Sequence, residues 1–359
     1  MAGNKWMTPM IIMLLVLGTL LNAGCIQHDE KKSGDTVKIT DMLDRTVEVP
    51  ENVEKVVGLE SGALRLLVYL ECEDKVVGVE DTEDDGGRPY NYAYPELADL
   101  PSIGPIHGGD PELIVTQEPD VIFWVFATEI QADNIQEKTG IPVVALDYGD
   151  LDNNKETFYK CLRLVGVVMN KEDRAEELIN SIEDSIQDLN DRTKDIPNDQ
   201  KEKVYVGAVS YYGNHGILST ERDYTPFEFV NANNVASGLD AEHADIDKET
   251  LRDIWNPDVI FIDEGGLYLV NEDLKDEVIA SIDAVKNGEL YGVLSYNWYG
   301  INFATVLANA YYIGKVLYPE NFTDIDPEQK ADDIYQDFLG KGVYQYMKDT
   351  YGGFKKLEL

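Results

Sequence analysis

The feature that most constrains the fold is a short repeat in which a helical stretch, a proline and a strand follow one another. Residues 119–123 and 257–261 both read PDVIF, and the second copy begins 138 residues after the first. Each copy follows a stretch of helical character, at 111–117 and at 249–255. Proline ends such a helix, and the β-branched pair begins a strand. The matching context predicts two related α/β lobes within one chain.

Short β-rich segments alternate with helical ones in the first half of the chain. Four segments flanked by Gly or Pro are predicted to be buried strands, at 55–58, 75–79, 121–124 and 143–146. Helices are predicted between them, for instance at 61–70 and 128–139. Strands that alternate with helices favour a mostly parallel sheet with helices on both faces.

Three further segments have readable patterns. The β-branched segments 37–39 and 46–49, with a turn near Asp44, predict a hairpin that precedes the first sheet. Residues 281–294 predict a small second hairpin, because Asn287 and Gly288 are typical of a two-residue turn. The closing stretch, 326–359, predicts helices that pack on the second lobe.

A long amphipathic helix is predicted between the two copies of the repeat, at 171–192. Its apolar side chains recur at three- and four-residue intervals, at Ala175, Leu178, Ile179, Ile182, Ile186 and Leu189. Asn170 is the predicted N-cap. Twenty-two residues at 1.5 Å each give a rod of ~33 Å, which is comparable with a domain diameter. We therefore predict an α/β fold of two Rossmann-like lobes joined by a single long α-helix.

The N-terminus reads as an export signal. Lys5 precedes an apolar run at 10–21, which is too short to cross a bilayer and is followed by Ala23 and Gly24. The next residue, Cys25, resembles the lipidated cysteine of a lipoprotein signal; the alternative is an uncleaved N-terminal anchor. We predict a chain that works outside the cytoplasmic membrane, with these segments: signal peptide 1–24, flexible linker 25–37, N-terminal lobe 38–170, spine helix 171–196 and C-terminal lobe 197–359.

The composition of the chain excludes some classes of binding partner. The chain has 68 acidic and 30 basic residues and a net charge of −38, so we expect no binding to nucleic acid. The two cysteines besides Cys25 are Cys72 and Cys161, for which separate buried thiols are expected, although sequence leaves their pairing open. The glycine-rich and nucleophile motifs of dehydrogenases, phosphate-binding loops and α/β-hydrolases do not occur where they would be needed. We predict no catalysis; an enzyme on this architecture and a sensing module that does not transport are the rival classes.

Several strings resemble the binding proteins of iron-siderophore and vitamin B12 ABC importers. They are, in order, DMLDRTVEVPENVEKVVGL (41–59), DKVVGV (74–79), LPSIG (100–104), PELIVTQEPDVIF (111–123), TGIPVVAL (139–146), YNWYGINF (296–303) and KVLYPENF (315–322). The resemblance implies two lobes bridged by one helix and a chelated metal or corrinoid in the cleft between them. It also implies delivery of that ligand to a membrane permease and its ATPase. No resident cofactor is expected, and we expect a monomer.

Ligands of open α/β sheets sit outside the carboxyl ends of the strands, so the loops there should line the cleft. Many of these loops carry aromatic side chains, which suit a bulky and partly flat ligand. Arg88 and Arg222 are predicted to pair with a carboxylate or phenolate of the ligand, or with a neighbouring acid such as Glu221. The predicted ligand-binding residues are Ser61, Arg88, Tyr90, Tyr92, His107, Tyr148, Tyr211, Tyr212, His215, Arg222, Tyr224, Glu264, Tyr296, Trp298 and Tyr299.

Two further hypotheses concern metal and permease. His107 and His215 lie in loops of different lobes and are candidate ligands for a bare metal ion, with Glu264 as a third; the alternative is a structural role. The resemblance implies that Glu112, seven residues before Pro119, docks to the permease, with Glu249 as the second-lobe candidate. The predicted cargo is a ferric-siderophore-type chelate, with a corrinoid second and a molybdate- or tungstate-like oxyanion third.

Overall fold

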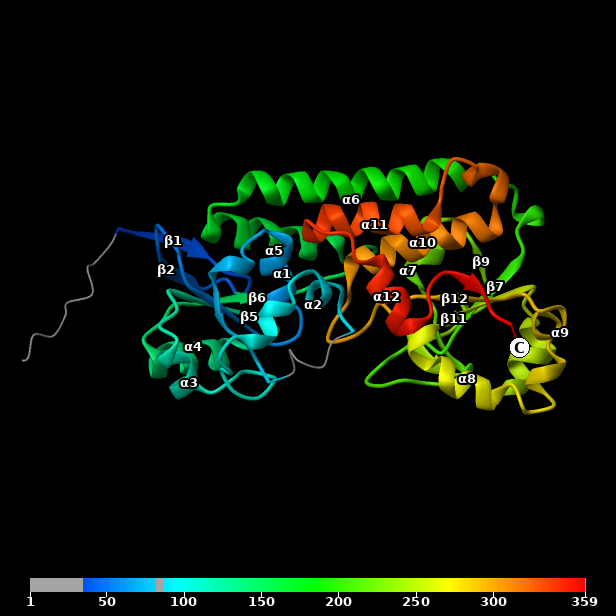
Figure 1. Ribbon diagram of the computed structural model, residues 1–359, viewed down its shortest axis with the longest axis horizontal. Coiled ribbons are helices and arrows are strands. Elements are labelled where there is room, and N and C mark those ends of the chain that lie inside the picture. Colours follow the sequence, from blue (N-terminus) through cyan, green and yellow to red (C-terminus); the bar gives the residue numbers. More distant parts are fainter. Residues whose placement is uncertain (1–34, 82–86, 359) are drawn as a thin grey trace, which may run out of the picture. The chain divides into compact units, whose positions relative to one another are not determined.

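The computed structural model describes residues 35–81 and 87–358 (Figure 1). Cys25 and the predicted signal peptide lie outside the described residues. From Asp35 onward the chain forms one compact unit. No helix in these two described ranges has both the length and the apolar character that a membrane crossing requires.

Four parallel strands form the sheet of the first lobe. They are β3 (Val56–Leu59), β4 (Val76–Gly78), β5 (Val121–Val125) and β6 (Val143–Leu146), in the order β4-β3-β5-β6. The predicted first hairpin is present as β1 (Thr36–Thr40) and β2 (Thr46–Pro50), which pair antiparallel. The strand β1 therefore begins within the last two residues of the predicted linker. The helices of this half are α1 (Ala63–Tyr69), α2 (Pro89–Ala93), α3 (Pro111–Thr116), α4 (Glu129–Thr139) and α5 (Lys155–Met169).

The sheet of the second lobe has five strands in the order β13-β12-β11-β7-β9. They are β7 (Lys203–Gly207), β9 (Asn233–Asn234), β11 (Val259–Asp263), β12 (Leu290–Val293) and β13 (Lys355–Lys356), of which only β13 runs antiparallel to its neighbour. A separate antiparallel pair consists of β8 (Ser219–Glu221) and β10 (His243–Asp245). The helices are α7 (Thr225–Phe229), α8 (Leu267–Asp273), α9 (Asp283–Asn287), α10 (Phe303–Leu317), α11 (Pro327–Leu339) and α12 (Tyr344–Tyr351).

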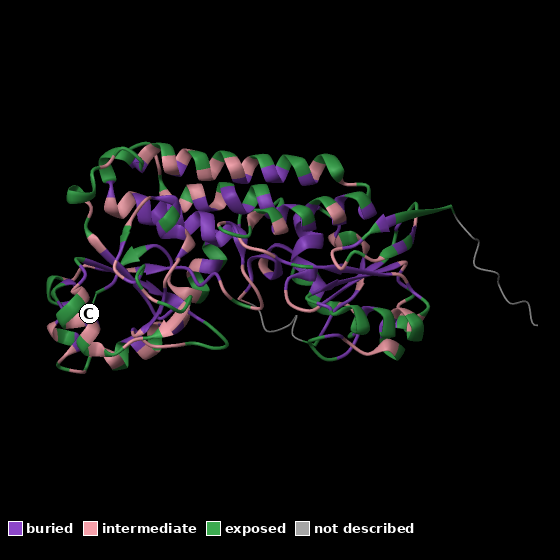
Figure 2. Ribbon diagram, turned by 180° about the vertical axis from the view of Figure 1, so that it is seen from behind, coloured by how far each residue is buried: buried purple, intermediate pink, exposed green. Residues whose placement is uncertain are grey.

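The central strands of both sheets are buried on both faces, because alternate residues of these strands belong to different cores. In β5, Phe123 packs in a core shared by both lobes, whereas Ile122 packs in a core confined to the first lobe. In β11, Phe261 joins the shared core and Ile260 a core confined to the second lobe. Figure 2 shows the central strands of both sheets as buried. This double cover is typical of parallel sheets with helices on both sides and confirms the predicted fold class.

The long helix α6 (Glu172–Thr193) lies along the layer of helices that covers both sheets (Figure 1). Arg174, near its start, donates a hydrogen bond to the carbonyl of Tyr69 in the first lobe at 3.2 Å. Arg192, near its end, forms an ion pair with Asp324 at 2.7 Å. The predicted N-cap was wrong: Asn170 instead ends α5 in the left-handed conformation (φ 55°), and Lys171 stands at the start of α6.

The repeat has a structural cause that is the same in both lobes. Asp120 accepts a hydrogen bond from the Lys55 amide at 3.0 Å, and Asp258 accepts one from the Lys203 amide at 2.8 Å. Each aspartate thus ties the start of its own strand to the start of the neighbouring one. The helix before the second copy is a π-helix, Thr250–Trp255, in place of the α-helix before the first.

One prediction about the C-terminal half was wrong. Residues 281–294 form α9 and β12 instead of a hairpin, because Gly288 (φ 68°) ends a helix. A left-handed glycine serves either purpose, so the sequence signal was ambiguous. The terminal helices also pack beyond the second lobe: Phe338 of α11 lies edge-on to Tyr69 of α1, with ring centroids 5.0 Å apart.

Cys72 and Cys161 are both buried and free.

Candidate functional site

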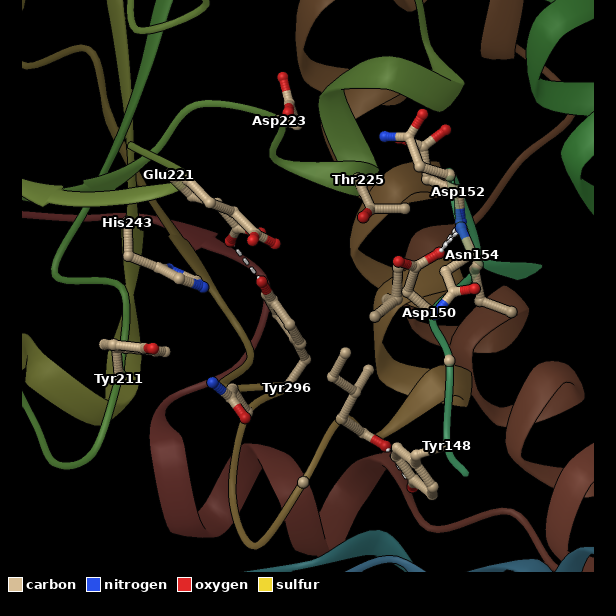
Figure 3. A pocket seen from close by; sticks show the side chains of 18 of the residues that line it. Tyr148, Asp150, Asp152, Asn154, Tyr211, Glu221, Asp223, Thr225, His243 and Tyr296 are labelled. Atoms are coloured by element: carbon tan, nitrogen blue, oxygen red, sulfur yellow. Dashed lines mark hydrogen bonds between the residues drawn. The ribbon is translucent and has the colours of Figure 1, made fainter. Parts of the chain in front are cut away.

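A cavity with a volume of about 940 Å³ is lined by loops from both lobes (Figure 3). We call it the first cavity. Phe126 and the loop that follows β6 come from the first lobe, and β8, β10 and the loop after β12 come from the second. Figure 3 shows Glu221, His243 and Tyr296 on one side and Asp150, Asp152 and Asn154 on the opposite side.

The first-lobe wall is a loop at 147–154 that is held by hydrogen bonds between the Asp150 side chain and the loop's own backbone. The carboxylate of Asp150 accepts hydrogen bonds from the amides of Asp152 and Asn154, both at 2.8 Å. The Tyr148 hydroxyl donates to the Ile301 carbonyl at 2.8 Å, which joins this loop to the second half of the chain. The loop therefore presents carboxylates to the cavity on a fixed backbone.

The second-lobe wall is built around a cross-strand pair. The register of β8 and β10 sets Glu221 opposite His243, and residues opposite each other in a sheet project from the same face. Glu221 is 6% exposed and accepts a hydrogen bond from the Tyr296 hydroxyl at 2.5 Å. Burial raises the pKa of Glu221 to about 8, so this carboxyl group is largely protonated at neutral pH.

The imidazole of His243 is positioned by stacking. Its ring lies 4.1 Å from the ring of Tyr211 at an interplanar angle of 18°. Burial lowers the pKa of His243, which favours the neutral imidazole. Ligand atoms of Glu221, Glu242 and His243 all lie within 4.8 Å of one another, and among the described residues no other group of His, Cys, Asp and Glu has metal-ligand spacing. We call these three residues the second-lobe cluster.

The first cavity is strongly acidic. Its lining contains six carboxyl groups, those of Asp147, Asp150, Asp152, Glu221, Asp223 and Glu242. Against them stands one guanidinium, that of Arg222, and it pairs with Asp223 at 2.6 Å instead of with the predicted Glu221. With Glu221 protonated, five negative charges still face one positive charge. Such a site favours a cationic or neutral ligand that donates hydrogen bonds.

A second cavity of about 620 Å³ shares Asn297 with the first. The predicted residues Tyr92, Glu264 and Trp298 line it, together with Tyr351. Glu264 is only 5% exposed and accepts the Gly353 amide at 2.7 Å, so this carboxyl group ties down the C-terminal segment. Burial raises the pKa of Glu264 to about 8.

Other predicted residues lie beneath the cavities. Arg88, Tyr90 and Tyr224 are at most 2% exposed, and the Arg88 guanidinium lies 5.5 Å from the ring centroids of both Tyr90 and Tyr299. Sequence reasoning missed Arg65, which is 1% exposed and donates to the carbonyls of Trp298, Tyr299 and Ile301 at 3.0 to 3.2 Å. The guanidinium of Arg65 thus joins α1 to the loop after β12.

The structure does not bring His107 and His215 together. His107 is exposed and contacts Glu60 at 2.5 Å. His215 contacts the Tyr211 carbonyl at 2.8 Å, and neither histidine lines either cavity.

The remaining candidates are distributed as follows. Tyr148, Tyr211, Arg222 and Tyr296 line the first cavity, whereas Ser61, Tyr212 and Tyr299 line neither; Tyr212 is 96% exposed, and the Tyr299 hydroxyl donates to Glu80 at 2.6 Å.

The two docking candidates lie on the surface. Glu112 is exposed in the first turn of α3, where its amide donates to Asp110 at 2.8 Å. Glu249 is exposed directly before the π-helix. Each acid thus stands at the start of the helix before its copy of the repeat, but Thr250 and not Glu249 lies seven residues before Pro257.

Comparison with known proteins gives concordant matches. The sequence profile of the periplasmic binding protein family matches residues 56–295. The molybdate-binding protein MolA of Haemophilus influenzae is 27% identical over 84% of this chain and 90% of its own length. The petrobactin-binding protein YclQ of Bacillus subtilis is 22% identical over 81% of this chain and 92% of its own length.

The fold has a solved counterpart. The structure of Haemophilus influenzae MolA bound to molybdate has a TM-score of 0.69 and 24% identity, and the match covers 85% of this chain and 98% of that one. The likeness in fold agrees with the family match, which spans most of both lobes. The chain belongs to the periplasmic binding protein family and is built as the substrate-binding protein of an ABC transporter.

Proposed function

We propose that this chain captures a metal chelate of the ferric-siderophore type in the first cavity and delivers it to the membrane permease of an ABC importer. The observation that carries the proposal is the lining of that cavity, which combines an acidic surface with aromatic side chains from both lobes. Phe126, Tyr148, Tyr211 and Tyr296 supply the aromatic part. Carboxylates recognise hydrogen-bond donors and positive charge on the periphery of a chelate, and the rings pack against its apolar parts.

The volume of the first cavity also suits a chelate. At about 940 Å³ it lies near the upper end of the range of ~300–1,000 Å³ that small-molecule sites occupy. A tetrahedral oxyanion is much smaller than this space. A corrinoid is the larger alternative and would need the second cavity as well.

Molybdate is the second candidate, and the similarity to MolA over 84% of the chain favours it. The electrostatics of the first cavity oppose it. A dianion among five carboxylates would be repelled, and the one guanidinium in the lining is engaged by Asp223. We therefore rank a neutral or cationic chelate above the oxyanion.

Isothermal titration calorimetry of the purified protein tests the proposal. The titrants are a ferric hydroxamate, a ferric catecholate, cyanocobalamin and sodium molybdate. We expect saturable binding of a ferric chelate, weakened by Tyr211→Ala in the first cavity and unaffected by Tyr268→Ala, a matched exposed tyrosine of the second cavity. Saturable binding of molybdate alone would contradict the proposal.

Delivery requires contact with a permease, for which Glu112 and Glu249 are the proposed docking groups. Both are exposed. Glu112 lies seven residues before Pro119, whereas Glu249 lies eight residues before Pro257, so the two positions differ by one residue in the repeat. In an uptake assay with the cognate permease and ATPase, Glu112→Ala is expected to reduce transport while leaving chelate binding by the isolated protein unchanged. Equal uptake by Glu112→Ala and the wild type would remove this docking role.

We also propose that the chain is anchored outside the cytoplasmic membrane by a lipid on Cys25. The support is the sequence that precedes this residue, an apolar run followed by Ala23 and Gly24. Mass spectrometry of the protein from native membranes should find a diacylated N-terminal cysteine, and Cys25→Ser should release the protein from the membrane fraction. An unprocessed N-terminus would contradict the anchor.

A further inference from the structure

The second-lobe cluster has the composition of a metal site. From its geometry we infer that Glu221, Glu242 and His243 bind a first-row transition metal ion directly, each through one side-chain atom. The inference rests on the proposed function, because it names the groups that would hold the metal of the same cargo. It replaces the histidine pair expected from the sequence with residues of one lobe.

Backbone register gives the cluster its shape. Glu221 and His243 are cross-strand partners in β8 and β10, so their positions relative to each other are fixed by the sheet. Ligand atoms of the three residues lie within 4.8 Å of one another. Two ligands at ~2.1 Å from one ion are at most about 4.2 Å apart. Glu242 is exposed, so a change of its rotamer can bring its carboxylate closer to the other two residues.

The surroundings of Glu221 and His243 favour a cation as their common partner. The Glu221 carboxyl group is 6% exposed, and within the part of the chain that the structure describes it forms no ion pair. One carboxyl oxygen accepts the Tyr296 hydroxyl, which leaves the second oxygen for a ligand. The Nδ1 atom of His243 is buried and has no hydrogen-bond partner. Buried polar atoms are normally paired, and one metal ion would engage both groups at once.

The ligand set selects the class of metal. An imidazole nitrogen with two carboxylate oxygens suits iron, zinc, nickel or manganese, whereas calcium and magnesium prefer oxygen ligands alone. Tyr211 stacks on the imidazole and fixes its plane, and Tyr296 fixes the Glu221 carboxylate. Such supporting contacts orient metal ligands in characterised sites. The remaining positions on the ion face the cavity, where other groups of the cargo can occupy them.

Titration of the full chain with CoCl2 in a non-coordinating buffer tests the site, because the visible absorption of Co²⁺ reports its ligands. We expect one saturable Co²⁺ site that excess Ca²⁺ does not displace. His243→Ala and Glu242→Gln should each weaken Co²⁺ binding by at least about 10-fold. His107→Ala is the matched control, since His107 lies outside both cavities, and it should bind Co²⁺ like the wild type.

Three outcomes distinguish this inference from the proposed function. Co²⁺ binding that is unchanged in Glu242→Gln, an exposed position where folding is not at risk, would overturn the site. Displacement of Co²⁺ by Ca²⁺ would assign the signal to nonspecific acidic groups and also overturn it. If either result is found while the protein binds a ferric chelate normally, the proposed function stands without this metal site. If the wild-type protein binds no ferric chelate, the proposed function itself is wrong.

Discussion

The two lobes are alike in architecture and different in what they offer a ligand. Both place parallel strands beneath a shared layer of helices, and both use an aspartate of the PDVIF repeat to align neighbouring strands. The first lobe lines the first cavity mainly with a loop that is fixed by its own backbone. The second lobe lines it with buried and half-buried side chains, among them Glu221 and His243. The two lobes therefore share their sheet architecture, whereas the candidate metal-binding side chains of the cavity come from the second lobe.

The largest effect is expected from a substitution in the hydrophobic core that both lobes share. Phe303 of α10 is fully buried and stacks on Phe158 of α5 with ring centroids 3.9 Å apart. Phe303→Ala should lower the free energy of unfolding by about 3–5 kcal/mol while a single transition persists. Chemical denaturation followed by circular dichroism measures both. Phe126→Ala, at a position 55% exposed, should cost far less, and separate transitions for the two lobes would contradict a common core.

The second lobe should also respond to pH more strongly than the first, through Glu264. Its pKa is raised from 4.5 to about 8 in the folded protein, because the carboxyl group is buried. The folded state holds the proton more tightly, so the stability from this group is complete below pH 4.5 and is lost as pH rises toward 8, by roughly 1.4 kcal/mol per pH unit. The difference in unfolding free energy between Glu264→Gln and the wild type should therefore grow in favour of the variant over this window. A constant difference would show that the carboxyl is ionised when folded.

The contact between the lobes can be examined at Arg65. Arg65→Met keeps the aliphatic stem but removes the donors that three carbonyl groups of the loop after β12 accept. We expect a loss of about 2–3 kcal/mol in unfolding free energy, because buried acceptors are left without partners. Arg163→Met is the control, since the Arg163–Glu176 pair is half exposed and worth at most about 1 kcal/mol. Equal losses in the two variants would refute the bridging role of Arg65.

The smallest effect concerns the repeat itself. Asp120→Ala and Asp258→Ala each remove a hydrogen bond at the start of the neighbouring strand, to the amides of Lys55 and Lys203, and Asp120→Ala also removes the one to the Glu54 amide. Each hydrogen bond is worth about 1 kcal/mol, so Asp120→Ala should be the costlier of the two by about that amount in thermal or chemical denaturation. A much larger loss at one site would show that the duplicated aspartates have diverged in their structural role.

The frame of this protein could be predicted from sequence because it depends on local patterns. Strands such as 121–125 and 143–146 are short β-branched runs, and the helix at 172–193 has an apolar stripe of clear period. Those signals fix fold class without knowledge of tertiary contacts. Asn287 and Gly288 led to a wrong prediction of a hairpin, because a left-handed glycine occurs both in hairpin turns and at helix ends.

The site could be predicted only in part. Position after a strand placed Tyr148, Tyr211 and Tyr296 correctly in the neighbourhood of the cavity, but it also selected Arg88 and Tyr90, which the fold buries. Glu221 and His243 are 22 residues apart and meet through a strand register that no local pattern specifies. The adjacent Glu242 and His243 were the only available signal, and a single such dipeptide carries little weight.

The central claim is that the cavity between the lobes holds a metal complex against the second-lobe cluster. Anomalous X-ray diffraction at the iron edge, from crystals grown with the tightest-binding ferric chelate, tests it most directly. The account predicts one peak in the first cavity, within coordination distance of Glu221, Glu242 and His243. A peak in the second cavity beside Tyr92 and Trp298, or a first cavity that takes molybdate and no iron, would contradict it.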